Sequence, residues 1–206
     1  MMKLLSLDSP VMRFLSKAAD LMLLNALFLI CSLPVITIGA SLTALFTATM
    51  KLSKNEEGYL ITTFFKSFKR NFRQSTAAWL IFLSIGTIAA VDFLAVPSSF
   101  PYLGSVLHFL LGTVVLLALL TAAYVFPCLA SFEGSLNIIM KNSILIATVN
   151  LPVTLALFAL PVMSVVISMF LGLSSACLYF TLCGFSLNAF AASFLLQNVF
   201  AKYEPE

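Results

Sequence analysis

Charged side chains are nearly missing from the last two-thirds of this chain. Between positions 76 and 200 the only acidic, basic or histidine residues are Asp92, His108, Glu133 and Lys141. A protein folded in water needs a charged surface, whereas apolar runs of about 20 residues suit a hydrocarbon core about 30 Å thick. Of the 206 residues, 61% are hydrophobic and 9% charged. We therefore predict an all-α, polytopic helical membrane bundle, with residues 1–206 forming a single membrane domain.

The number of membrane segments depends on the first apolar run, residues 21–50. This run contains Pro34 and Gly39. Proline removes a backbone donor and clashes with the preceding turn, so a helix must kink or stop there. Further apolar runs cover about 76–96, 102–132, 144–171 and 173–200. The pattern predicts six transmembrane segments if the first run breaks near Pro34, or five if it crosses once.

Basic residues indicate the orientation, because loops rich in Lys and Arg stay in the cytoplasm. Six of the eleven lie within residues 51–75. If the first run crosses once, the basic residues before it are left outside, whereas two crossings bring all eleven to one side. This favours six segments, with the basic loop 51–75 and the C-terminus cytoplasmic. The second segment, 35–50, would be short, at about 24 Å.

Residues 60–74 show two sets of side chains at helical spacing. The apolar set is Ile61, Phe64, Phe65, Phe68 and Phe72, and the basic set is Lys66, Lys69, Arg70 and Arg73. At 100° per residue the two sets centre on opposite sides of a helix. This pattern is typical of an amphipathic interfacial helix, with aromatic rings in the acyl boundary and cations toward headgroups. The same surface could dock a partner protein. The membrane-surface or partner-docking candidates are thus Phe64, Phe65, Lys66, Phe68, Lys69, Arg70 and Arg73.

A few polar residues fall inside the predicted spans. Asp92 is the one carboxylate there, and such acids are often functional. It lies near the outer boundary, however, where an interfacial structural role also fits. Asn25, Asn150 and Asn188 are amides that would bind helices together or line a polar path. The intramembrane polar candidates are Asp92, Asn150 and Asn188.

The sequence gives no sign of an enzyme. Phosphate-binding loops, serine-nucleophile elbows and zinc-protease helices are missing from the sequence, and no predicted span holds a carboxylate pair. Four cysteines sit in apolar runs without ligand spacing. The net charge of +3 is too small to suggest nucleic acid. We predict no catalytic residue, no cofactor and no metal site.

Three motifs resemble the YesL family of bacterial integral membrane proteins. The first is NALFLICSLPVITIGA at 25–40 followed by TAL at 43–45, and the second is EEGY at 56–59 followed by FFKSFKRNFRQ at 64–74. The third is FPCLASFE at 126–133, which lacks the arginine often found near Ser131. The resemblance implies a bacterial cell membrane, inner or plasma, and a domain of unknown function. It carries no established active residues, and the family's genes commonly neighbour carbohydrate importers of the ATP-binding cassette (ABC) type.

Two functions follow as hypotheses. The first is an accessory or regulatory subunit of a sugar importer, in which the small-residue face at 39–48 or the helix at 60–74 docks on the permease or ATPase. The alternative is a stand-alone transporter or channel for a small solute. A faint repeat favours the alternative, because residues 65–71 resemble 136–142 and both precede an apolar run. The lipid bilayer is the one partner that both hypotheses share.

Overall fold

Helices make up nearly all of the computed structural model, which describes residues 10–56, 59–95 and 101–203. In chain order the elements are α1 (Pro10–Cys31), η2 (Val35–Thr37), α2 (Ile38–Ser53), α3 (Leu60–Ala95), α4 (Pro101–Ser131), α5 (Leu136–Val149), α6 (Leu151–Phe170), α7 (Leu173–Tyr179), the π-helical segment η3 (Phe180–Gly184) and α8 (Phe185–Phe200). These described residues contain no strand. The predicted all-α class is confirmed.

Six helical segments of the described chain are long and apolar enough to cross a membrane. They are Val11–Cys31, Val35–Ser53, Leu60–Phe93, Val106–Ser131, Leu151–Phe170 and Leu173–Phe200. The first apolar run is divided as predicted, since α1 ends at Cys31 and α2 begins at Ile38. The chain is a multi-pass membrane protein with six apolar helical segments in the described residues. Residues 97–100, between the apolar runs predicted at 76–96 and 102–132, lie outside the described residues.

Two helix boundaries differ from the prediction. The amphipathic segment 60–74 and the span after it form one helix, α3, of 36 residues, because no proline or glycine interrupts residues 60–85. At 1.5 Å per residue α3 is about 54 Å long, well beyond a 30 Å hydrocarbon core. The run at 144–171 instead divides at Asn150, whose backbone leaves the helical region (φ −110°, ψ 48°). Pro152 favours this break, because it lacks the amide that would continue the ladder.

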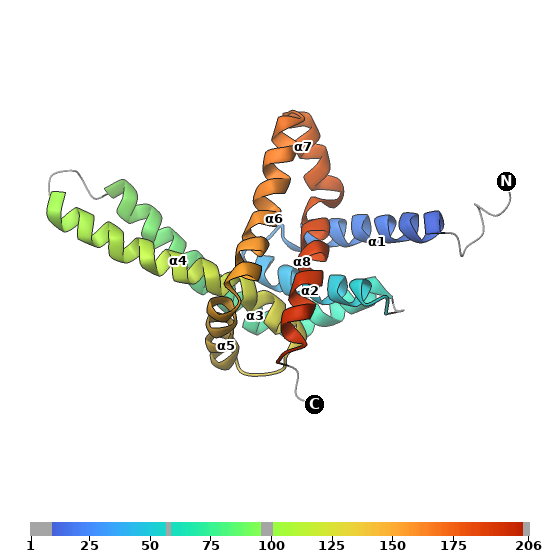
Figure 1. Cartoon of the computed structure of the whole chain (residues 1–206), viewed down its shortest axis with the longest axis horizontal. Coiled ribbons are helices and arrows are strands. Elements are labelled where there is room, and N and C mark those ends of the chain that lie inside the picture. Colours follow the sequence, from blue (N-terminus) through green and yellow to red (C-terminus); the bar gives the residue numbers. More distant parts are fainter. Residues whose placement is uncertain (1–9, 57–58, 96–100, 204–206) are drawn as a thin grey trace.

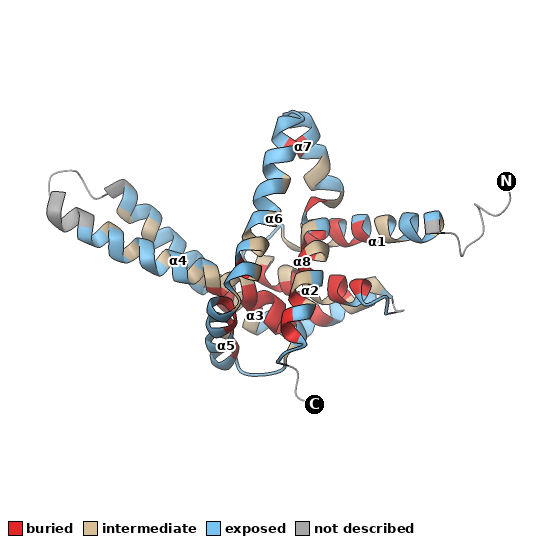
Figure 2. Ribbon diagram, viewed as in Figure 1, coloured by how far each residue is buried: buried red, intermediate tan, exposed pale blue. Residues whose placement is uncertain are grey.

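Three arms extend from a common base (Figure 1). The outer halves of α3 and α4 form one arm, α6 with α7 and α8 forms a second, and α1 points away from both. Buried residues concentrate where α2, α3, α4, α5 and α8 meet, while the arms are exposed (Figure 2). The largest buried cluster there includes Tyr124, Leu129, Ile146 and Leu196. Lipid is the medium that can cover such apolar arms.

Helix α2 packs along the basic half of α3 and reaches the start of its apolar half, where Gly39 lies against Ser75 and Trp79. The hydroxyls of Thr43 and Ser75 lie 2.8 Å apart, and those of Thr47 and Ser67 lie 2.7 Å apart. The small-residue face of α2 makes this approach close, as such faces do between membrane helices. Ala40, Ala44 and Ala48 are fully buried. The hypothesis that this face docks on a partner is therefore wrong, since the protein itself covers it.

The turn between α1 and α2 is apolar and exposed. Leu33, Val35 and Ile36 each expose more than half of their surface. Several backbone carbonyls of this turn find partners inside the protein: Thr37 Oγ1 lies 2.6 Å from Cys31 O and 2.7 Å from Pro34 O, which share its one proton. Trp79 Nε1 donates to Val35 O at 2.8 Å. Irregular backbone at membrane depth requires such partners, because hydrocarbon offers none.

We expect the α1–α2 turn to lie within the bilayer beside Trp79, not in the water on the far side. In a variant whose native cysteines are alanine, Leu33→Cys and Ile36→Cys should stay unlabelled by a membrane-impermeant maleimide added to either side. Tyr59→Cys, which precedes α3 and is 87% exposed, should be labelled from one side only. Labelling of the turn from the side opposite Tyr59→Cys would contradict this and give a full crossing by α1 and α2.

Candidate functional site

The basic side chains of α3 form an exposed surface. Lys66, Lys69, Arg70 and Arg73 are all exposed, as predicted. Arg70 Nη1 lies 3.6 Å from Glu133 Oε1, with side chains 51% and 90% exposed. An ion pair so open to solvent contributes little to stability. The surface therefore keeps nearly all of its positive potential for lipid headgroups or for another protein.

The aromatic side chains of the same helix do not form one lipid-facing surface. Phe64 is fully buried among residues of α1, α2 and α8, and Phe68 packs against this cluster. Phe65 and Phe72 are 47% and 40% exposed. The prediction of rings in the acyl boundary is wrong for Phe64 and Phe68, because α1 and α2 cover that face of α3. Helical spacing alone identified an aromatic face on this helix, but it could not reveal which helices pack against that face.

Asp92 is paired with the single histidine. His108 Nε2 lies 3.8 Å from Asp92 Oδ2, across the α3–α4 arm, and 11% of the Asp92 side chain is exposed. The ring of Phe93 meets His108 edge-on, with centroids 6.2 Å apart. The sequence marked both residues, but their pairing required the register of the two helices. Across the described residues, no three His, Cys, Asp or Glu side chains cluster as a metal site would require.

The amides of Asn150 and Asn188 both join helices. Asn150 donates to Ile146 O at 3.1 Å and to the hydroxyl of Tyr203 at 3.3 Å, at the break between α5 and α6. Asn188 donates to Ser164 Oγ at 3.0 Å and to Gly184 O at 2.7 Å. Asn188 also lines a largely apolar cleft of ≈ 390 Å³ between α6 and α8. The structure brings neither of these two amides to Asp92, which lies in the other arm.

Asn25 makes the most complete polar contact of the described chain. Its Nδ2 donates to Phe180 O at 3.0 Å and to Thr181 O at 2.8 Å. Its Oδ1 accepts from the backbone amides of Phe185 at 3.1 Å and Ser186 at 3.2 Å. The wide turn of a π-helix disturbs the regular backbone ladder. One buried side chain of α1 thus satisfies four backbone groups around η3 in the last span.

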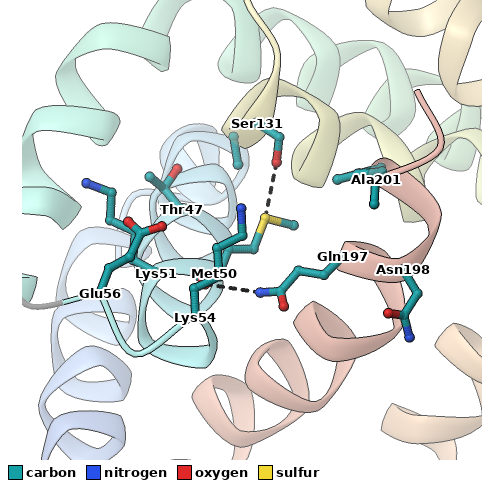
Figure 3. Close-up of a pocket in the computed structure, with 11 residues that line it drawn as sticks. Thr47, Met50, Lys51, Lys54, Glu56, Ser131, Gln197, Asn198 and Ala201 are labelled. Carbon is teal, nitrogen blue, oxygen red and sulfur yellow. Dashed lines mark hydrogen bonds between the residues drawn. The ribbon is translucent and has the colours of Figure 1, made fainter. Parts of the chain in front are cut away.

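A pocket of ≈ 420 Å³ with a mixed polar and apolar lining lies where the C-terminal ends of α2, α4 and α8 meet (Figure 3). Its charged lining residues are Lys51, Lys54 and Glu56. Lys17 Nζ donates to Asn55 Oδ1 at 2.7 Å, which holds the start of α1 at the same end of the molecule. The sequence did not predict this pocket, because its residues come from three helix ends far apart in the chain.

Comparison with known families agrees with the motifs. The family model described as "Protein of unknown function, DUF624" matches residues 21–93. This stretch covers the second half of α1, all of α2 and nearly all of α3, and so includes the first two motifs. No curated protein and no solved structure matches the chain. The resemblance inferred from the sequence is thus confirmed over its most specific part.

Proposed function

We propose that this chain, whose residues 21–93 carry the DUF624 domain of the YesL family, is a non-enzymatic accessory or regulatory membrane subunit. Its partner would be a carbohydrate importer of the ABC type in a bacterial cell membrane. The basic loop 51–75 and the C-terminus would face the cytoplasm, following the placement of Lys and Arg. We infer the class of partner from the genes that commonly neighbour the genes of this family. The observation that carries the proposal is the exposed surface on α3.

We call this surface the α3 docking face and define it as Phe65, Lys66, Lys69, Arg70, Phe72 and Arg73. It mixes arginines with half-exposed aromatic rings, residue types that are enriched at protein interfaces. It lies on the N-terminal half of α3, the part of this long helix that extends beyond the hydrocarbon core. Within the described residues its four cations have one carboxylate partner, the exposed Glu133. Such a face suits an acidic surface on a cytoplasmic or membrane partner.

Neutralising the α3 docking face should release the partner without unfolding the protein. In a Lys66→Gln, Lys69→Gln, Arg70→Gln variant we expect recovery of the importer by co-purification in detergent to fall about tenfold or more, since complementary charge pairs across an interface contribute upwards of about 1.5 kcal/mol each. The unfolding temperature should stay nearly unchanged, because the three side chains are exposed.

Lys51→Gln, Lys54→Gln serves as the control, since it removes positive charge from the same end outside the α3 docking face. If both variants lost recovery of the importer equally, the effect would come from total positive charge and not from the α3 docking face. If the wild-type chain never co-purifies with the permease or ATPase, and its deletion leaves sugar uptake unchanged, the proposed function is wrong.

A transporter remains the competing proposal, supported by the cleft between α6 and α8 and by the Asn188 amide that lines it. Liposomes containing only this chain separate the two. Solute flux that falls in Asn188→Ala and Asp92→Asn variants would favour transport, whereas no flux would favour the accessory role.

A further inference from the structure

The pocket at the ends of α2, α4 and α8 has the chemistry of an anion site. Lys51 and Lys54 contribute two ammonium groups against the single carboxylate of Glu56. In the described part of the chain no carboxylate lies within ion-pair distance of either lysine. Figure 3 shows both lysines on the α2 side of the pocket, with Gln197 reaching toward Met50 from α8. We propose that this pocket binds a phosphate group carried by an anionic lipid.

Converging helix C-termini would oppose an anion if their carbonyls were open, because they carry partial negative charge. Here the carbonyls are largely occupied. Met50 O accepts from the amide of Lys54 at 3.2 Å and from Gln197 Nε2 at 3.1 Å. Gln197 also bonds Ser53 Oγ. Cys128 O and Gln197 O accept the amides of Phe132 and Ala201. The two lysines therefore dominate the local potential.

The rest of the lining favours a lipid over a small inorganic ion. Met50, Ala130, Phe200 and Ala201 give the pocket an apolar side, and ≈ 420 Å³ is more room than one phosphate fills. The pocket also lies at the end of membrane helices that carries most of the basic residues, where headgroup phosphates lie. Basic pockets between membrane helices are known to take anionic headgroups. Glu56 could accept a hydrogen bond from a hydroxyl of a glycerol headgroup.

The test measures lipid retention on the purified full chain in detergent. Native mass spectrometry with added phosphatidylglycerol should show bound lipid on the wild type, and phosphatidylcholine should not replace it. Lys51→Gln, Lys54→Gln should weaken retention about tenfold or more, because each basic residue near an anionic headgroup contributes on the order of 1 kcal/mol. Lys66→Gln, Lys69→Gln removes the same charge from the α3 docking face and should retain the lipid.

A second arm adds inorganic phosphate at increasing concentration. If inorganic phosphate displaces the lipid from the wild type but not from the Lys51→Gln, Lys54→Gln variant, the site recognises phosphate from either source. Retention that resists phosphate would support the intact lipid as the ligand. The proposal is overturned if both double variants lose the lipid equally, if phosphatidylcholine binds as well, or if Lys51→Gln, Lys54→Gln lowers the unfolding temperature and leaves retention unchanged.

Discussion

Replacing Asn25 with leucine is expected to destabilise the protein by about 2–4 kcal/mol. Leucine has a similar volume and keeps α1 apolar, so the change isolates the hydrogen bonds. Leucine would remove the two bonds that Asn25 Nδ2 donates to Phe180 O and Thr181 O, and the two that Oδ1 accepts from the amides of Phe185 and Ser186. No water reaches Asn25, which is fully buried. Polar partners lost at this depth cost more free energy than a bond lost at the surface, because no water replaces them.

The measurement is thermal or denaturant unfolding of the purified chain in detergent. Asn188→Leu is the matched control, because that amide is half-buried and gives up two bonds rather than four. We expect less than half of the Asn25 effect there. Asn25→Leu should also loosen η3 selectively, so amide exchange at positions 180–186 should rise before exchange in α2. Equal effects at the two asparagines would show that Asn25 does not hold the π-helical segment.

The sequence could predict the membrane class and the six apolar segments of membrane-spanning length, because both depend on composition along single segments. Pro34 marked the break between α1 and α2 for the same local reason. The continuation of α3 from Leu60 to Ala95 was missed, since an amphipathic pattern beside an apolar one suggested two elements. The division at Asn150 was missed because proline is also tolerated inside membrane helices, where neighbouring groups satisfy the freed carbonyls, so Pro152 did not mark a helix start. Local sequence patterns thus predicted which helices form, but not where all of them begin and end.

Within the candidate site, the sequence predicted correctly only the exposure of the charged side chains. Lys66, Lys69, Arg70 and Arg73 had to lie outside the core, and they do. Phe64 was misplaced because its burial depends on α1 and α2, which no spacing within 60–74 reveals. The pairing of Asp92 with His108 and the pocket around Lys51 and Lys54 needed contacts between distant segments. The bonds of Asn25 to residues 155 and more positions away had no signal beyond an amide in an apolar run.

Adding one methyl group at Gly39 should be nearly as damaging as removing Asn25. A Cβ at this position would overlap the backbone carbonyl oxygen of Ser75 and come within 2.7 Å of Trp79 Cβ. The backbone of α3 cannot yield as a side chain would, so α2 and α3 must separate. For Gly39→Ala we expect a loss of about 1–3 kcal/mol, the usual cost of overpacking. The Thr43–Ser75 bond and the Trp79–Val35 bond lie in the same contact and should weaken together.

Gly86→Ala provides the control within α3, because a Cβ there meets nothing within 4 Å. Alanine is the better helix former by about 1 kcal/mol, so Gly86→Ala should leave the unfolding temperature unchanged or raise it. Tryptophan fluorescence reports the local effect, since Trp79 is the only tryptophan. Its emission should shift in Gly39→Ala and stay constant in Gly86→Ala. A Gly39→Ala protein with wild-type stability and emission would mean that α2 and α3 do not approach as closely as Gly39, Ser75 and Trp79 indicate.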